Sequence, residues 1–271
     1  MEHAPGSNHL CGDNFQALAN ATFTQAPPLP DTGIIYCKVD HVMACFEALR
    51  RKPGPYVVVT HKGDFSTGQH HVQAMPDNVV RWFTVGASIT DNPRVEGIPF
   101  GIADGCYNAW PLDHGRWDTL DAERQKTVYQ DRLLHVCFCP STNPDLRRPA
   151  IQAVQAWTPC ETYVNLDIRP KPFAIYLAEM HRHKFTLAPP GGGWDCCRMW
   201  EAFYLGVIPV CLKHPTYSWW DDLPFCFIDR WSDLSPEFLT EQHKSITSQD
   251  HSLEKLFMPY WRNKIQAALH I

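Results

Sequence analysis

Three glycines and three charged residues lie close together in the segment APPGGGWDCCRMWEAFYLGVIPV, residues 188–210. The glycines are Gly191, Gly192 and Gly193, and they precede a helix that the sequence predicts over residues 195–205. Glycines in this position allow positive φ angles, and they let an anionic ligand approach backbone N–H groups at a helix N-terminus. The segment therefore predicts a binding loop for an anion.

The charged residues Asp195, Arg198 and Glu201 recur every three positions along the predicted helix, so they share one side of it. We expect this side to face away from the core, because the apolar residues of the helix gather on the opposite side. Arg198 can donate two hydrogen bonds to phosphate oxygens, and the Glu201 carboxylate suits the hydroxyls of a ribose. These residues predict a nucleoside diphosphate site, with a surface turn and a solvated arginine–glutamate pair as the alternative.

The elements that must position these residues alternate between strands and helices along most of the chain. Continuous runs such as YVVVTH are typical of strands that are buried on both faces of a parallel sheet. Strands are predicted over 33–40, 56–61, 79–86, 95–102, 133–139, 184–189, 207–212 and 223–229, and helices over 41–51, 119–132, 144–157, 172–180, 235–246 and 252–269. This pattern predicts an α/β fold with parallel sheets.

The two ends of the chain depart from this alternation. Residues 1–30, which end within the run QAPPLPDTG, are expected to form an extended arm, whereas Pro259 lies inside the last predicted helix and should kink it. A length of 271 residues suits two compact domains. We therefore divide the chain into an arm (1–30), an N-terminal domain (31–130), a C-terminal domain (131–250) and a final helix (251–271).

Composition narrows the class of protein. The chain is 44% hydrophobic and has a formal net charge of −5 with no basic run, which favours a packed core and no nucleic-acid partner. No apolar run approaches the ~20 residues that a membrane-spanning helix needs, and the start lacks a signal-peptide pattern. Eleven cysteines without a CxxC pair predict free thiols in a reducing compartment, and hence a cytoplasmic protein. His70 and His71 lack a further ligand nearby, so no metal is expected.

Longer motifs around the glycine run resemble a known family. The segment KFTLAPPGGGWDCCRMWEAFYLGVIPV resembles the C-terminal signature of exostosin-like glycosyltransferases, in which a strand, a Pro-Gly-rich loop, an arginine and a Trp-Glu-Ala run precede Gly-x-Ile-Pro-Val. DLPFCFIDRWSDLSPEFL, STNPDLRR and YWRNKI are similar to the same family. The likeness is closest to small stand-alone members such as those encoded by large algal viruses. It covers about 135–265 well and the first half loosely, and it departs at residues 194–197, which leaves the role of Asp195 open.

The resemblance implies a fold and an activity. The implied fold is GT-B, with two Rossmann-like domains that face each other across a cleft and a final helix that crosses back to the first domain. The implied activity is transfer of a sugar from a nucleotide diphosphate to a glycan hydroxyl, with inversion at the anomeric carbon. We expect a UDP-sugar held mainly by the C-terminal domain, with xylose as the suggested sugar, and no cofactor or metal.

An inverting transfer needs a base for the acceptor hydroxyl and positive charge for the departing diphosphate. Asp64 follows the strand predicted over 56–61 and is the preferred base, with His61 as the second candidate and a simple turn as the alternative reading. Arg147 follows the strand over 133–139 by a short turn, and Lys213 follows the strand over 207–212. Both could therefore reach the diphosphate.

Two other functions remain open at this point. A catalytically silent carbohydrate-binding protein could keep the same fold, although acceptor binding alone would not need a diphosphate site. A nucleotide-sugar-processing enzyme of another class is the second, although the chain has neither a GxSxG nor a GxGxxG motif. The sequence does not define the donor sugar, the acceptor, the linkage or the oligomeric state.

Overall fold

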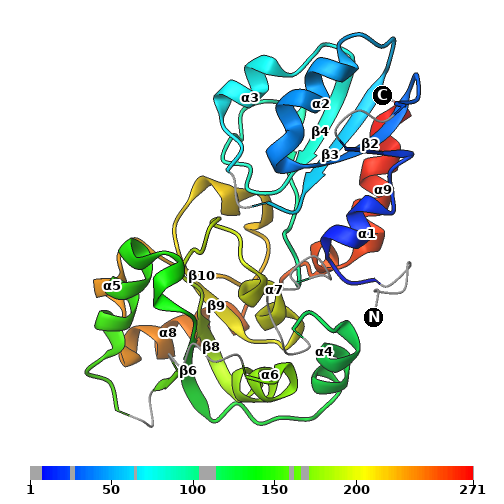
Figure 1. Cartoon of the computed structure of the whole chain (residues 1–271). Helices are drawn as coiled ribbons and strands as arrows, with labels where there is room; N and C mark the ends of the chain where they lie inside the picture. Colours follow the sequence, from blue (N-terminus) through cyan, green and yellow to red (C-terminus); the bar gives the residue numbers. More distant parts are fainter. Residues whose placement is uncertain are drawn as a thin grey trace. The chain divides into compact units, whose positions relative to one another are not determined.

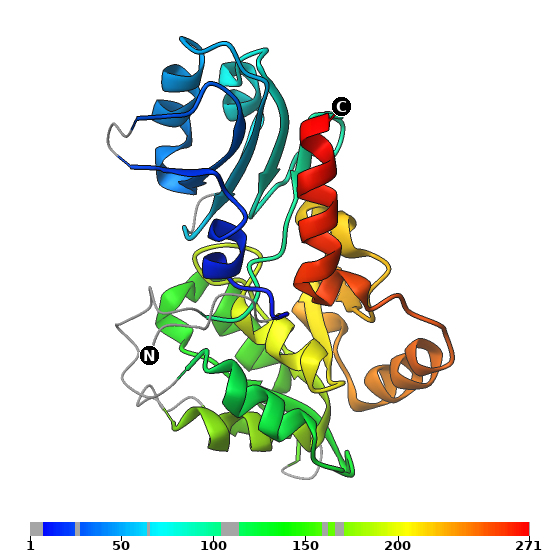
Figure 2. The ribbon, with the colours of Figure 1, turned by 90° about the vertical axis from the view of Figure 1, so that its right-hand side faces the viewer.

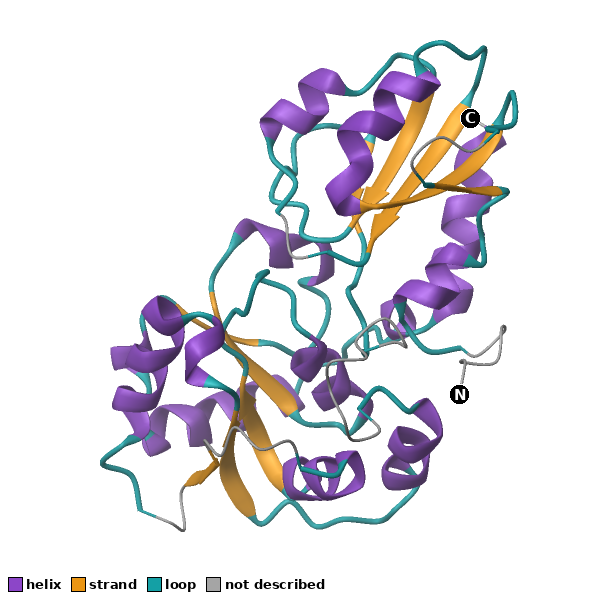
Figure 3. Ribbon diagram, viewed as in Figure 1, coloured by secondary structure: helices purple, strands orange, loops and turns teal. Residues whose placement is uncertain are grey.

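Two units, each built around a parallel sheet, make up the computed structural model of the chain, which describes residues 8–24, 28–63, 66–103, 114–158, 162–165 and 171–270 (Figures 1 and 3). The first unit comprises Met1–Gly101, His214–Trp220 and Glu254–Ile271, and the second comprises Ile102–Lys213 and Asp221–Leu253. The expectation of an α/β fold with two parallel sheets is confirmed. The GT-B architecture and the limits at residues 30, 130 and 250 stay predictions, because contacts within each unit do not test them.

The sheet of the first unit follows the chain. Its strands lie side by side in sequence order, and every neighbouring pair is parallel. The central strand β3 is buried along its whole length, as its β-branched run predicts. The five strands are β1 (Ala21–Phe23), β2 (Gly33–Lys38), β3 (Tyr56–His61), β4 (Val79–Thr84) and β5 (Val95–Gly97).

Helices cover both faces of this first sheet. On one face, α2 (Val42–Leu49) and α3 (Gln69–Ala74) enclose a core with the apolar side chains of the strands. On the other face lie α1 (Gly12–Gln16) and α9 (Met258–Ala267), so the two ends of the chain share one side of the sheet (Figure 2).

Both expectations for the chain ends need correction. An extended arm is wrong for residues 12–16 and 21–23, which form α1 and the edge strand β1. Leu10 and Phe15 are fully buried in the unit. The predicted kink at Pro259 is also wrong, because α9 begins at Met258 and places the proline in its first turn. A proline there breaks no intrahelical hydrogen bond, since the first N–H groups of a helix have no partner.

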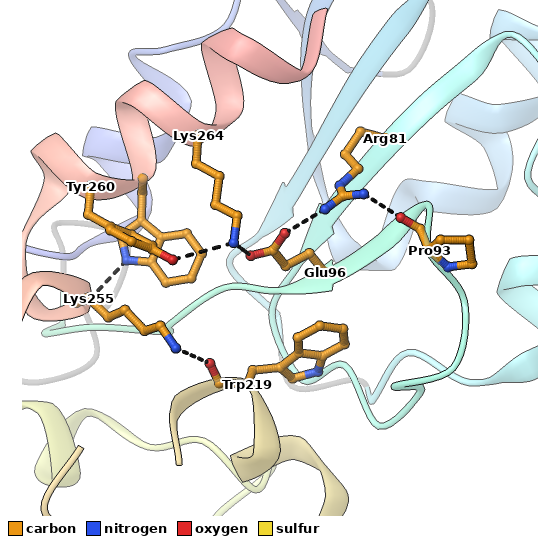
Figure 4. Close-up of polar contacts among 8 residues, drawn as sticks. Arg81, Pro93, Glu96, Trp219, Lys255, Tyr260 and Lys264 are labelled. Atoms are coloured by element: carbon orange, nitrogen blue, oxygen red, sulfur yellow. Dashed lines mark hydrogen bonds and ion pairs between the residues drawn. The ribbon is translucent and has the colours of Figure 1, made fainter. Parts of the chain in front are cut away.

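A buried carboxylate ties α9 to the sheet (Figure 4). The Glu96 side chain on β5 is only 7% exposed and accepts from Arg81 Nη2 at 3.0 Å, while its other oxygen pairs with Lys264 of α9. Nearby, the Trp219 indole donates to the Ala87 carbonyl at 3.1 Å. A Cβ atom at Gly97 would lie 2.2 Å from this ring, so β5 requires glycine there.

The sheet of the second unit has a different strand order. All its neighbouring strands are parallel, and their order across the sheet is β10, β9, β8, β6, β7. Their bounds are β6 (Arg132–Cys137), β7 (Thr162–Asn165), β8 (His183–Leu187), β9 (Ile208–Leu212) and β10 (Cys226–Ile228). The chain therefore runs outward from β6 to β7 and then returns past β6 to β8.

Two layers of helices cover this second sheet. The helices α5 (Pro144–Val154) and α8 (Pro236–Thr247) pack on one face with the apolar side chains of the strands. The helices α4 (Trp117–Arg124), α6 (Phe173–His181) and α7 (Cys197–Tyr204) lie on the other side of the sheet (Figure 1). Within the part of the chain that the structure describes, no helix has the length and apolar character to cross a membrane.

The reversal of strand order marks one edge of the second sheet as a place for ligands. Loops that follow β6 and β8 leave the sheet in opposite directions, because the crossover helices of these strands lie on opposite faces. In open α/β sheets, ligands bind beyond the carboxyl ends of the strands at this kind of switch point. The glycine run 191–193 follows β8, so it lies at the switch point.

Candidate functional site

Hydrogen bonds connect the glycine loop after β8 to the start of α5. Asn143 Nδ2 donates to the Gly191 carbonyl at 2.9 Å, and Arg147 Nε donates to the Pro190 carbonyl at 2.9 Å. Within the loop, Gly191 N–H donates to the Gly193 carbonyl at 3.0 Å. The loops that follow β6 and β8 therefore form one connected structure at the switch point.

The glycine at position 191 is required by packing and not by its φ angle. None of residues 191–193 has a positive φ, so that expectation is wrong. A Cβ atom on Gly191 would instead lie 2.9 Å from Arg147 Nη2, closer than side chains normally approach. The loop also lies apart from the helix start, since α7 begins at Cys197. At its end, Gly206 terminates α7 with φ 67°.

Arg147 is buried at the start of α5. Its side chain is 5% exposed, and Nη1 donates to the Cys139 carbonyl at 2.7 Å. The guanidinium lies 5.5 Å from the centroid of the Phe138 ring, within the range of a cation–π contact. Burial lowers the pKa of Arg147 to about 10, and the nearby charge of Arg198 acts in the same direction. Burial therefore makes the charged form of Arg147 less favourable than it would be in water.

Arg198 lies on the same aromatic ring. Its Nε donates to the Cys137 carbonyl at 2.9 Å, and its guanidinium is 5.4 Å from the Phe138 centroid. Among the described residues, neither Arg147 nor Arg198 has a carboxylate within 4 Å, and the Nη2 group of each has no hydrogen-bond partner. The charge of Arg198 acts unfavourably on that of Arg147. Like charges without a counter-ion are costly, and an anion bound by both arginines would offset that cost.

Glu201 lies one helical turn beyond Arg198. Its side chain is 4% exposed, and Oε2 accepts a hydrogen bond from the Tyr176 hydroxyl of α6 at 2.9 Å. Within the described part of the chain, Oε1 has no hydrogen-bond partner. Burial raises the pKa of Glu201, and the charge of His114 and the Tyr176 hydrogen bond oppose that rise. One carboxylate oxygen is therefore held by the protein and the other is available to a ligand.

The prediction that the charged side of this helix faces solvent is wrong. Asp195 and Glu201 are buried and Arg198 is half-buried. The physical reason is that α7 packs against β9 on one side and against α4 and α6 on another, so it has no free polar face. Asp195 also precedes the helix, whose N-cap is Cys196, and it accepts from the Trp200 indole. That contact gives the buried carboxylate a hydrogen-bond donor.

Lys213 lies at the same edge of the sheet, directly after β9. It pairs with Asp229, which follows β10, at an N···O distance of 3.0 Å, and both side chains are more than half exposed. An exposed pair of this kind contributes little to stability. Lys213 therefore stays a candidate ligand contact on the basis of its position alone.

His61 is the last residue of β3 in the first unit, and its side chain is buried. Its ring is stacked between Phe15 and Phe100, with centroid distances of 5.4 and 5.3 Å. Nδ1 accepts from the Lys62 N–H at 2.8 Å, which places the ring proton on Nε2, 3.1 Å from the Pro99 carbonyl. Both nitrogens are therefore engaged in the fold. The other candidate base, Asp64, lies outside the described residues.

Sequence reasoning missed Phe138, Asn143 and Tyr176 as parts of this site. Their contacts join positions that are far apart in the chain, such as Asn143 with Gly191 and Tyr176 with Glu201. The sequence offered only one signal, which was position: Phe138 lies near the end of the strand predicted over 133–139, and Asn143 follows that strand. Over the described ranges, no group of three or more His, Cys, Asp or Glu side chains is arranged to hold a metal ion.

Comparison with known proteins adds no assignment. No protein-family model matches the chain, and no curated protein matches it. The likeness to exostosin-like glycosyltransferases therefore rests on the short motifs alone.

Proposed function

We propose that the chain is an inverting glycosyltransferase that binds the diphosphate of a nucleotide sugar at the carboxyl ends of β6 and β8. One observation carries the proposal. Two guanidinium groups, those of Arg147 and Arg198, lie on one aromatic ring beside a glycine loop, and neither has a carboxylate partner among the described residues. A diphosphate supplies the missing negative charge in a form that both arginines can bind.

The same residues suit the chemistry of the transfer. As the acceptor oxygen attacks the anomeric carbon, the bond from that carbon to the diphosphate breaks and negative charge develops on the leaving group. Arg147 and Arg198 stabilise that charge without a metal ion. The available oxygen of Glu201 accepts hydrogen bonds from the ribose hydroxyls of the donor.

The base that takes the acceptor proton belongs to the first unit in this proposal. His61 has both ring nitrogens engaged, so Asp64 is the preferred base. A GT-B arrangement of the two units is part of the proposal. The motif resemblance, and not the geometry, suggests UDP as the nucleotide, xylose as the sugar and a glycan hydroxyl as the acceptor.

Calorimetric titration of the whole chain with UDP tests the site, and incubation with a panel of UDP-sugars tests the activity. We expect UDP binding and slow release of free sugar from one donor, with inverted anomeric configuration by NMR. No binding of any nucleoside diphosphate at millimolar concentration would remove the basis of the proposal. Glycan binding without nucleotide binding would favour a silent carbohydrate-binding protein instead.

A further inference from the structure

Tyr176 of α6 makes a buried hydrogen bond to the candidate site. Its hydroxyl donates to Glu201 Oε2 at 2.9 Å, and both side chains are almost completely buried. The ring is fixed by three aromatic neighbours, with centroid distances of 6.1 Å to Phe173, 5.6 Å to His114 and 5.9 Å to His135. The tyrosine therefore has little freedom to turn away from the carboxylate.

The surroundings of Glu201 shift the pKa of its carboxyl in opposite directions. Burial raises the pKa of the carboxyl, whereas the charge of His114, the Tyr176 hydrogen bond and the charge of Arg198 lower it. The surrounding titratable and charged groups are Tyr176, Arg198 and His114, with the Cys137 thiol, His135 and the ion pair of Lys171 and Glu179 beyond them. The Tyr176 hydroxyl is the one group with a direct hydrogen bond to the carboxylate among the described residues.

We propose that Tyr176 is a positioning residue that holds the Glu201 carboxylate ionised and directs its second oxygen toward the bound ligand. A hydrogen bond from a neutral donor stabilises the ionised carboxylate without adding charge to the site. It also fixes Oε2, so that Oε1 is left to accept from ligand hydroxyls. The role toward the ligand rests on the proposed function, whereas the role toward Glu201 does not.

The first test needs no ligand. The titration of the Glu201 side-chain carboxyl is followed by ¹³C NMR in the wild-type chain and in Tyr176→Phe, which keeps the ring and removes the hydroxyl. We expect the titration midpoint to move to higher pH in the variant. Tyr56→Phe is the matched control, because Tyr56 is a buried tyrosine of the first unit whose hydroxyl donates to the Pro30 carbonyl at 2.8 Å. An unchanged or lower midpoint in Tyr176→Phe overturns the proposal.

The second test uses UDP as the probe in a double-mutant cycle. Tyr176→Phe should weaken UDP binding roughly tenfold at neutral pH, the effect of one hydrogen bond to a charged group, and the loss should grow as the pH falls. In a Glu201→Gln background the same change should have almost no further effect. An equal loss in both backgrounds would mean that Tyr176 only supports packing. Failure of the wild-type chain to bind UDP would count against the proposed function, and the ligand-free titration would still decide the role of Tyr176.

Discussion

The first sheet follows the chain from β1 to β5, whereas the second places β7 and β8 on opposite sides of β6. The polar side chains at the carboxyl ends of the two sheets also differ in their interaction partners. In the first unit, Lys62 pairs with Asp13, and both nitrogens of His61 are engaged. In the second, Arg147 and Arg198 donate to backbone carbonyls, Arg198 also donates to the Cys196 sulfur, and neither has a carboxylate partner among the described residues. The comparison indicates that, within the described part of the chain, two arginines lack a carboxylate partner where the strand order reverses.

The proposed function puts the base in the first unit and the donor site in the second, and one substitution tests that division most strongly. Asp64→Asn keeps the size of the side chain and removes its basicity. It should lower turnover by ~10²–10⁴-fold, the usual contribution of a general base, and leave UDP binding unchanged. His61→Asn is the control and should mainly reduce stability. Near-normal turnover in Asp64→Asn would place the base elsewhere.

The second unit should also be the more sensitive to acid through a buried histidine. His183 begins β8, and burial lowers its pKa to about 4, with Nδ1 donating to the Glu179 carbonyl at 2.7 Å. Between pH ~6.5 and ~4 the unfolded chain binds a proton that the folded chain excludes, so the free energy of unfolding falls as the pH falls, by about 3 kcal/mol in all.

Chemical denaturation at pH 7 and pH 4.5 measures this effect. His183→Asn keeps a donor near the Glu179 carbonyl and has no proton to take up, so it should lose less stability than the wild type over that interval. Equal losses in the two proteins would show that His183 titrates normally.

A change at Arg147 tests whether its charge serves a ligand. Arg147→Met keeps apolar contact with Phe138 and removes the charge, and it should weaken UDP binding by ~10–100-fold, as expected for loss of charge-assisted hydrogen bonds. Arg148→Met is the matched control, because Arg148 is the next residue of the same helix and is exposed. Calorimetry should show near-normal binding for the control. Similar losses in both variants would point to general electrostatics.

The polar cluster of the first unit should matter for stability and not for the donor. Glu96→Gln leaves Arg81 and Lys264 without their carboxylate, and we expect the free energy of unfolding to fall by about 2 kcal/mol. This is below the usual cost of breaking a buried pair because both cations are partly exposed. Glu47→Gln, at an exposed pair on α2, should change it by less than ~0.5 kcal/mol. A large loss of UDP affinity in Glu96→Gln would contradict the division.

The sequence predicted eight of the ten strands in the described residues, because parallel strands that are buried on both faces are continuous apolar runs. The expected strand over 56–61 coincides with β3, and the helix expected over 41–51 contains α2. The short elements α1, β1, α3 and β7 were missed because a few residues carry no periodicity. Glu201 was wrongly predicted to face away from the core for a different reason. The spacing of the charged residues shows that they share one face of the helix, but it does not show that α6 covers that face. The contact of Arg198 with the carbonyl of Cys137 spans 61 positions, so no local pattern reveals it.

The path of the chain through the first unit has a consequence for synthesis on the ribosome. Residues near the start of the chain pair with residues near its end. His9 and Phe257 form an isolated antiparallel β-bridge, and Met258 N–H donates to the Asn8 carbonyl at 2.9 Å. The last segment of the first unit begins only at Glu254, after the whole second unit has been made. We therefore expect the first unit to be completed after the second, whereas the usual order is that the N-terminal domain folds first as the chain emerges. The nascent chain can finish its second unit while Phe15 and the face of the first sheet still await Trp261, which contacts Phe15 at a ring-centroid distance of 6.3 Å.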